Sequence, residues 1–249
     1  MLLACLTTAC QPKRGTASED QRPDSAAADA PDSAGANGRA TPPADFVIVP
    51  GQQVGAVRAN SSEASLKKHY GAEAVVRDTV YLGEGQFEIG TTVFKHRAKQ
   101  MQILWKDKQA FARPETVFIR PEYDDTGQLH PGPAAGPMGA RIQWTIPVGA
   151  LRVGVGTSLR EVEKANGKPF KLYGFGWDYG GATSDWQGGK LTPVNKKSFL
   201  TLLFGFEPDF STSENKLYEA VLGDGEFLSS HPAMQSLNPT VKSLTVSFE

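Results

Sequence analysis

The chain has 249 residues, 39% of them hydrophobic and 21% charged, which is typical of a globular protein and is enough chain to bury a core in one or two domains. Its 26 lysines and arginines nearly balance its 27 aspartates and glutamates, so the formal net charge is −1. Such a balance provides neither the basic surface that binds nucleic acid nor a polybasic patch for anionic lipid, so charge indicates neither partner.

The N-terminal segment holds both cysteines, Cys5 and Cys10. The rest of the chain therefore has neither a disulfide framework nor a thiolate metal site. Residues 1–10 run from apolar residues through small ones into Cys10, which resembles the end of a bacterial lipoprotein signal peptide, where the cysteine is acylated. A complete secretory signal has a basic start and about 7–15 apolar residues. We therefore expect residues 1–10 to be a truncated signal segment.

Two registers for the acylated cysteine fit this pattern. Ala9 precedes Cys10, but Thr7 stands where lipoprotein signals usually have leucine. Residues 2–4 match the pattern better before Cys5, yet they leave little chain ahead of it. We favour Cys10, because it stands at the boundary between apolar and polar sequence. The resemblance implies a lipid anchor in the bacterial cell envelope, at the outer rather than the inner membrane, with the soluble part in the periplasm or at the cell surface. No other segment approaches the ~20 apolar residues of a membrane-spanning helix.

Residues 11–45 have the composition of a tether. They contain no Val, Ile, Leu, Met, Phe, Tyr or Trp, and consist mainly of Ala, Asp, Pro, Ser, Gly and Arg. Because such a segment cannot bury apolar surface to offset its ordering entropy, we expect it to be disordered. A flexible chain of about 35 residues spans roughly 30–35 Å, which would carry a domain clear of the lipid headgroups.

The remaining sequence contains an internal repeat. Val-Gly-Ala-Val-Arg at residues 54–58 and Val-Gly-Ala-Leu-Arg at residues 148–152 each follow a segment that reads as a short strand ending in proline. A capped helix is predicted after each string. The first has Asn60 three places before Glu63 and ends at Gly71, and the second has Ser158 three places before Glu161 and ends at Gly167.

Alternating apolar residues predict strands after each helix. In the first unit they lie at residues 80–82, 93–94, 101–105 and 117–119, and in the second at residues 199–206, 217–222 and 244–248. The sequence thus predicts an α+β fold of two tandem repeats, each a short helix packed on an antiparallel sheet. The repeats cover residues 46–120 and 141–249, and a Pro/Gly-rich connection at residues 121–140 joins them.

The second repeat resembles a known kind of unit. Its strand at residues 151–153, its glycine turn at 154–156, its helix start at 157–162 and its Asn-Gly-Lys-Pro-Phe exit at 166–170 are similar to the helix-plus-sheet repeats of β-lactamase inhibitory protein and of small outer-membrane assembly lipoproteins. The first repeat departs from this pattern, with Gly-Ala-Glu at residues 71–73. The resemblance implies a secreted or periplasmic binding module, and it carries over neither a partner nor a contact residue.

A search for chemistry finds no catalytic set, no metal site and no cofactor site. No two of the histidines His69, His96, His130 and His231 have the spacing of a zinc site. Asp124, Asp125 and His130 share a loop, which we interpret as solvated rather than as a cation site. The glycines at 154 and 156 are interpreted as a turn into a capped helix rather than a phosphate loop.

The most suggestive local feature is an aromatic segment rich in glycine. Tyr173, Phe175, Trp177 and Tyr179 alternate along a predicted strand, and Trp186 follows. On an exposed face they would form a stacking surface for a sugar or a peptide, and on a buried face they would be sheet core with glycines relieving crowding. We favour a buried strand whose end leaves Trp177 and Tyr179 partly exposed. The possible binding residues are Trp177, Tyr179 and Trp186.

These features favour a membrane-anchored lipoprotein whose non-catalytic module binds another envelope component, in particular a protein. A carbohydrate-binding lipoprotein that uses the aromatic strand is the alternative, and a hydrolase is a third reading. A flat exposed row of aromatic rings would favour a glycan, whereas a broad apolar patch would favour a protein.

Overall fold

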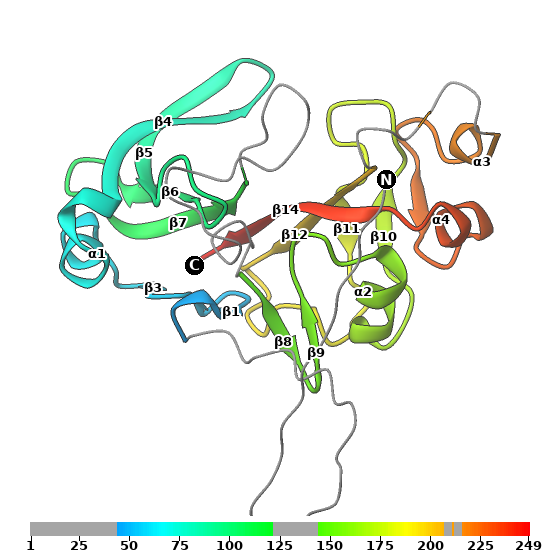
Figure 1. The fold of residues 1–249 in the computed structure, drawn as a ribbon, viewed down its shortest axis with the longest axis horizontal. Helices are drawn as coiled ribbons and strands as arrows, with labels where there is room; N and C mark the ends of the chain where they lie inside the picture. The colour runs from blue at the N-terminus through cyan, green and yellow to red at the C-terminus, as the bar shows by residue number, and fades with distance from the viewer. Residues whose placement is uncertain (1–43, 122–143, 207–210, 212–215) are drawn as a thin grey trace, which may run out of the picture. The chain divides into compact units, whose positions relative to one another are not determined.

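A six-stranded antiparallel sheet, in the order β12-β14-β7-β6-β5-β4, is the largest element of the structure (Figure 1). Its strands are β4 (Val75–Gly83), β5 (Gln86–Val93), β6 (Met101–Asp107), β7 (Ala112–Ile119), β12 (Leu200–Gly205) and β14 (Thr240–Ser247). The computed structural model describes residues 44–121, 144–206, 211 and 216–249. Outside the described residues lie Cys5, Cys10, most of the expected tether, nearly all of the connection at 121–140, and the loop residues Asp124, Asp125 and His130.

The β4–β5 hairpin turns through Glu84 and Gly85, whose φ angles are +49° and +74°. Positive φ at both central residues is the requirement of a type I′ turn, whose twist matches that of antiparallel strands. Because β5 pairs with β6 only from Thr91 to Val93 while β6 continues to Asp107, the outer part of the hairpin separates from β6 as a two-stranded ribbon.

The sheet joins the two halves of the sequence. Strand β14 pairs with β7 from Leu244 opposite Ile119 to Ser247 opposite Thr116, and β12 continues the sheet on the far side of β14. Strands predicted in separate repeats therefore lie in one continuous sheet.

Both predicted helices are present, each after a short hairpin. Helix α1 (Glu63–Tyr70) follows the hairpin of β2 (Gln53–Val54) and β3 (Val57–Arg58), and α2 (Leu159–Asn166) follows the hairpin of β8 (Ile146–Val148) and β9 (Leu151–Val153). As predicted, each ends before a glycine that has positive φ, at Gly71 and Gly167.

The cap of α2 was predicted correctly, but that of α1 was not. Ser158 and Glu161 form the capping box of α2. In α1 the cap is Ser62, which exchanges hydrogen bonds with Ser65, in place of the predicted Asn60 and Glu63. Asn60 lies instead within a turn that Ser61 closes by hydrogen bonds to Arg58.

The smaller elements complete the fold. They are η1 (Ala44–Phe46), β1 (Ile48–Val49), η2 (Ala72–Ala74), β10 (Lys171–Tyr173), β11 (Thr183–Asp185), α3 (Lys216–Glu219), β13 (Glu226–Leu228) and α4 (Pro232–Leu237). Strands β11, β10 and β13 form one three-stranded sheet, and β1, β2 and β3 form another.

Two predicted strands are wrong. Residues 217–222 form most of α3 and a turn, because Phe175 takes up the backbone groups of Val221 and Gly223 through hydrogen bonds of 2.8 and 2.9 Å. The aromatic segment also leaves the strand conformation after Tyr173, where β10 ends.

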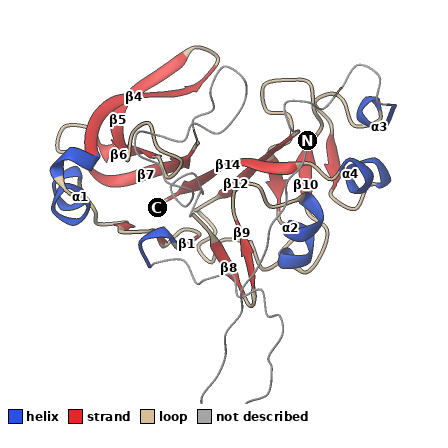
Figure 2. Ribbon diagram, viewed as in Figure 1, coloured by secondary structure: helices blue, strands red, loops and turns tan. Residues whose placement is uncertain are grey.

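The described residues combine helices with antiparallel sheets, so the predicted α+β class is confirmed, with strand the larger share (Figure 2). Leu66 of α1 and Val162 of α2 are buried in the same core as the largest sheet. Among the described residues, no helix has the length and apolar character needed to cross a bilayer.

Candidate functional site

The segment between β10 and β11 is a closed loop. Tyr173 N–H donates to the carbonyl of Ala182 at 2.9 Å, and Gly181 N–H donates back to the carbonyl of Tyr173 at 3.1 Å. Within the loop, the N–H of Gly180 donates to the carbonyl of Trp177, and the N–H of Ala182 to that of Tyr179. These bonds hold Trp177 and Tyr179 in a defined backbone conformation.

Two glycines of this loop allow another part of the protein's backbone to approach closely. A Cβ at Gly174 would lie 2.6 Å from the carbonyl oxygen of Gly223, and one at Gly181 would lie 2.3 Å from that of Phe204. Their lack of a side chain therefore reflects internal packing, which was one of the two alternatives that the sequence left open.

The alternating aromatics do not share one face, contrary to the prediction from their spacing. Phe175 is buried against Phe206 and Tyr218, with ring centroids 4.8 and 6.0 Å away. Trp177 and Tyr179 remain 36% and 50% exposed. The positive φ of Gly176 turns the chain between Phe175 and Trp177, so the strand periodicity of two does not apply.

Trp177 is held in position by three contacts. Its Nε1 donates a hydrogen bond of 2.9 Å to the carbonyl of Gly174. Its ring centroid lies 5.5 Å from that of Tyr173 and 5.3 Å from that of Tyr179, with interplanar angles of 87° and 69°. The exposed pair is therefore an angled corner of two rings and not a flat row.

Trp186, the third possible binding residue, lies apart from this pair. It is 5% exposed, its Nε1 donates to the carbonyl of Leu200 at 2.9 Å, and its ring packs on Phe170. Trp186 thus belongs to the core of the structure.

The tip of the β4–β5 hairpin contacts the loop. Tyr179 Oη donates to Glu84 Oε1 at 3.4 Å, and in Figure 1 the hairpin tip and the loop after β10 both lie at the top of the view. The charge of Glu84 raises the pKa of the Tyr179 phenol above its ordinary value, and Asp178 acts in the same direction.

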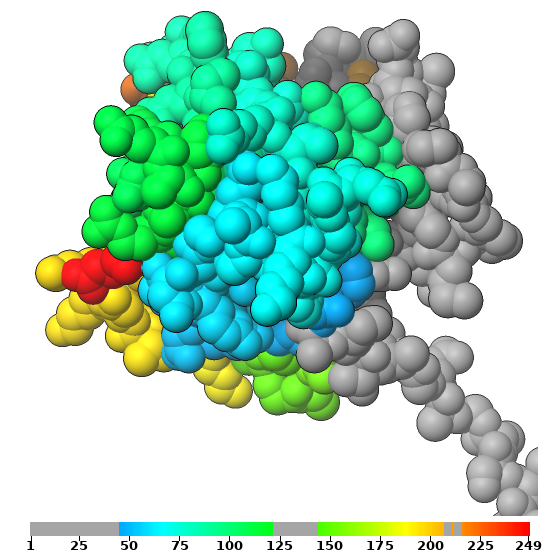
Figure 3. All heavy atoms as spheres, turned by 90° about the vertical axis from the view of Figure 1, so that its left-hand side faces the viewer, coloured from blue at the N-terminus to red at the C-terminus, as the bar shows by residue number. Residues whose placement is uncertain are grey.

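The sequence analysis missed an exposed apolar group on this hairpin, made of Tyr81, Phe87 and Ile89, which are 66%, 60% and 54% exposed. Tyr81 lies opposite Phe87, and their ring centroids are 6.3 Å apart. The usable signal was Glu84-Gly85, a turn pair flanked by alternating apolar residues. We call Tyr81, Phe87, Ile89, Trp177 and Tyr179 the aromatic surface. Figure 3 shows the hairpin at the top of one face of the molecule, above α1.

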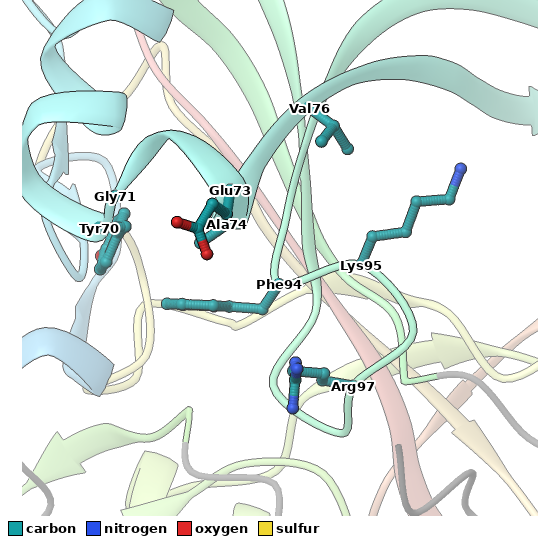
Figure 4. Close-up of a pocket in the computed structure, with 8 residues that line it drawn as sticks. All are labelled: Tyr70, Gly71, Glu73, Ala74, Val76, Phe94, Lys95 and Arg97. Atoms are coloured by element: carbon teal, nitrogen blue, oxygen red, sulfur yellow. The ribbon is translucent and has the colours of Figure 1, made fainter. Parts of the chain in front are cut away.

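A separate pocket of about 460 Å³ lies between the end of α1 and the chain after β5 (Figure 4). It is lined by Tyr70, Gly71, Glu73, Ala74, Val76, Phe94, Lys95 and Arg97. These described lining residues include no serine, threonine or cysteine, and their one hydroxyl is that of Tyr70, which accepts a hydrogen bond of 2.9 Å from the N–H of Ala56.

Lys95 in this pocket is already paired. Its Nζ lies 2.9 Å from the carboxylate of Asp78, and its side chain runs away from Tyr70 in Figure 4. Burial opposes ionisation of Asp78, but hydrogen bonds from Lys95 and Thr92 outweigh it and hold the pKa of Asp78 below its ordinary value.

No metal centre is formed in the described part of the chain, where no three His, Cys, Asp or Glu side chains gather. His69 pairs with Asp45 at 2.9 Å, and His231 caps α4 through the N–H of Ala233. Comparison with models of protein families, with curated proteins and with solved structures finds no match to this chain.

Proposed function

We propose that this chain is a lipid-anchored lipoprotein of the bacterial cell envelope, whose α+β part binds another envelope protein without catalysis. The observation that carries the proposal is the aromatic surface, in which five large side chains are each at least 36% exposed. Exposed apolar patches mark interaction sites more often than ordinary surface, and Trp and Tyr are enriched among residues that dominate binding energy. The two segments of the aromatic surface are linked by the hydrogen bond from Tyr179 to Glu84.

The ring geometry favours a protein over a carbohydrate partner. Stacking on a sugar requires a flat ring platform, whereas Trp177 and Tyr179 meet at 69°. The ribbon that carries Tyr81 and Phe87 adds apolar area on a second segment. An angled, two-segment surface suits the irregular contour of a protein.

The anchor is proposed from sequence. Cys10 is the lipidation site, with Cys5 as the alternative, and residues 11–45 are the tether that separates the membrane from the domain. The outer membrane is the preferred location. This arrangement would present the aromatic surface to a partner within roughly 30–35 Å of the lipid.

We also propose that the two halves arose by duplication of one helix-plus-sheet unit, and matching local contacts support this. Gly55 and Gly149 both have positive φ in the hairpin turn. Arg58 Nη1 donates to the carbonyl of Gly55 at 3.4 Å, and Arg152 Nη1 donates to that of Gly149 at 3.1 Å.

The cap residues support the same proposal. Ser62 forms an isolated bridge with Ala112 of β7, and Ser158 forms one with Thr240 of β14. If Ala112 and Thr240 are equivalent positions, then Thr116 and Leu244, four residues further along each strand, are also equivalent. The same holds for Ile119 and Ser247, seven residues further along. In the β7–β14 ladder Thr116 lies opposite Ser247, and Ile119 opposite Leu244. That exchange of partners is what a two-fold relation between duplicated strands produces.

The binding proposal is tested by capture with the full chain from detergent-solubilised envelope. Replacing Trp177 by alanine should reduce recovery of the bound protein about tenfold, which corresponds to the loss of one dominant contact. Phe199→Ala is the matched control, because Phe199 is 49% exposed and lies outside the aromatic surface. Equal recovery with wild type and Trp177→Ala would refute the proposal.

A further inference from the structure

We propose that the Trp177–Tyr179 corner binds a lysine or arginine side chain of the partner protein, with Glu84 and Asp178 as the carboxylates that select it. This inference rests on the proposed function and deepens it, because it states the chemistry of the segment that the aromatic surface accepts.

The first support is the aromatic geometry. Trp177 and Tyr179 lie edge to face, with ring centroids 5.3 Å apart at 69°, so each ring keeps a face that the other does not cover. Both rings are exposed by more than a third. A cation placed over an aromatic face is attracted by the negative charge density of that face, most strongly for Trp.

The second support is the charge that surrounds the corner. Asp178 lies between the two aromatic residues in the chain, and Glu84 Oε1 accepts the hydrogen bond of Tyr179. Both charges that raise the pKa of Tyr179 are therefore negative. Within the described part of the chain, neither Glu84 nor Asp178 has a lysine or arginine at ion-pair distance, whereas Asp78 and Glu88 do.

Arg120, which follows β7, contacts the hairpin, but its charge is directed away from the corner. Arg120 donates to the carbonyl of Tyr81, and its guanidinium lies 3.9 Å from the ring centroid of Phe118. Phe118 packs with Val80, whose side chain lies on the opposite face of β4 from that of Tyr81. As far as the described residues go, the negative charge at the corner is therefore open to a partner.

A lysine or arginine satisfies both features at once. Its charged end pairs with the carboxylates, and its methylene stem covers the apolar ring surface. An anionic or purely apolar segment would leave Glu84 and Asp178 without a counter-charge. The predicted partner segment therefore carries basic residues among apolar ones.

Trp177 provides its own reporter for a test. The other three tryptophans, Trp105, Trp144 and Trp186, are 1%, 0% and 5% exposed, so fluorescence quenching by dissolved ions reports mainly on Trp177. With the quenching by each ion expressed relative to that of free N-acetyltryptophanamide, caesium should quench the fluorescence of the full chain more strongly than iodide. Glu84→Gln combined with Asp178→Asn should remove that difference.

The direct test is titration of the full chain with two capped synthetic peptides, one alternating lysine with valine and one alternating glutamate with valine. The lysine peptide should change the Trp177 fluorescence with an affinity that falls as salt rises, and the glutamate peptide should not. Glu84→Gln with Asp178→Asn should weaken lysine-peptide binding about tenfold. Glu73→Gln with Glu115→Gln removes the same net charge from other elements and should leave binding unchanged.

Three results would overturn the inference: equal responses to the two peptides, unchanged binding by the Glu84/Asp178 double variant, or an equal response to vesicles of phosphatidylethanolamine, whose headgroup carries an ammonium. Failure here is distinguishable from failure of the proposed function. If Trp177→Ala loses the envelope partner while the double variant keeps it, the binding function stands and the charge selection does not.

Discussion

Single tryptophans with the same chemistry have different roles in this chain. Trp186 is 5% exposed and hydrogen-bonded to the backbone of β12, whereas Trp177 is 36% exposed on a loop. Trp186→Ala should therefore lower the free energy of unfolding by about 3–5 kcal/mol, and Trp177→Ala by less than about 1.5 kcal/mol. Urea unfolding of the two variants measures both values. A loss for Trp177→Ala as large as that for Trp186→Ala would assign Trp177 to the core and remove it from the binding surface.

Glu63 is a buried carboxylate whose ionisation should couple stability to pH. Burial opposes its charged form, but Lys67 Nζ at 2.6 Å, Thr91 Oγ1 at 3.0 Å and Arg77 Nε at 3.3 Å outweigh that cost and lower its pKa below 4.5. Because the pKa of Glu63 is lower in the folded state than in the unfolded state, its charge stabilises the fold fully above pH 4.5. This stabilisation is lost as the pH falls through the pKa that Glu63 has in the folded state.

The matched comparison uses Glu63→Gln, which keeps the shape of the side chain and cannot ionise. Urea unfolding at about pH 7 and at about pH 3 should show a larger loss of stability for wild type than for the variant. The comparison isolates Glu63 from Asp78, whose pKa is also lowered. Equal losses in the two proteins would show that Glu63 does not contribute to the acid sensitivity.

At the scale of elements, the sequence predicted the helices, whose formation depends on contacts between residues close in sequence. The helices α1 and α2 formed as expected because caps, apolar spacing and terminal glycines act within a few residues. The loop after Tyr173 was not predictable in this way. It is shaped by hydrogen bonds from Phe175 to Val221 and from Phe204 to Gly181, which join residues far apart in sequence.

The candidate site, likewise, was predicted only where local sequence determines the structure. The polar and glycine residues around Trp177 and Tyr179 correctly indicated that both are partly exposed, but the sequence grouped them with Trp186, which tertiary packing buries. The hairpin residues Tyr81 and Phe87 were missed because alternation in a strand does not show where its pairing with the neighbouring strand stops.

The helices α1 and α2 give a prediction at this scale. Leu66 of α1 is 1% exposed and Val162 of α2 is fully buried. Replacing a buried leucine by alanine typically costs about 2–5 kcal/mol, and a buried valine somewhat less. Both Leu66→Ala and Val162→Ala should therefore lower the unfolding midpoint in urea. Because β7 and β14 belong to one sheet, each variant should still unfold in a single transition. A second, separate transition in either variant would show that the halves unfold independently.

At the scale of the whole molecule, two of the contacts between the two halves of the sequence bear on the proposed site. The β7–β14 ladder joins them within the sheet, and the Tyr179–Glu84 contact joins them at the aromatic surface. The surface therefore depends on the assembled pair of halves, since neither half alone contains both the hairpin and the loop. A tethered domain with such a surface can engage a partner only where the anchor holds it, so the anchor is part of the proposed function.

The anchor prediction concerns Cys10. Because acylation at a cysteine is what would hold the chain in the membrane, Cys10→Ala should move the protein from the detergent-rich to the aqueous phase when Triton X-114 extracts of cells are separated. Cys5→Ala is the control and should leave the protein in the detergent-rich phase. Release by Cys5→Ala together with retention of Cys10→Ala would assign the lipid to the other register. Retention of the double variant would refute lipid anchoring at either cysteine, and the proposed function would then have to place the aromatic surface by another route.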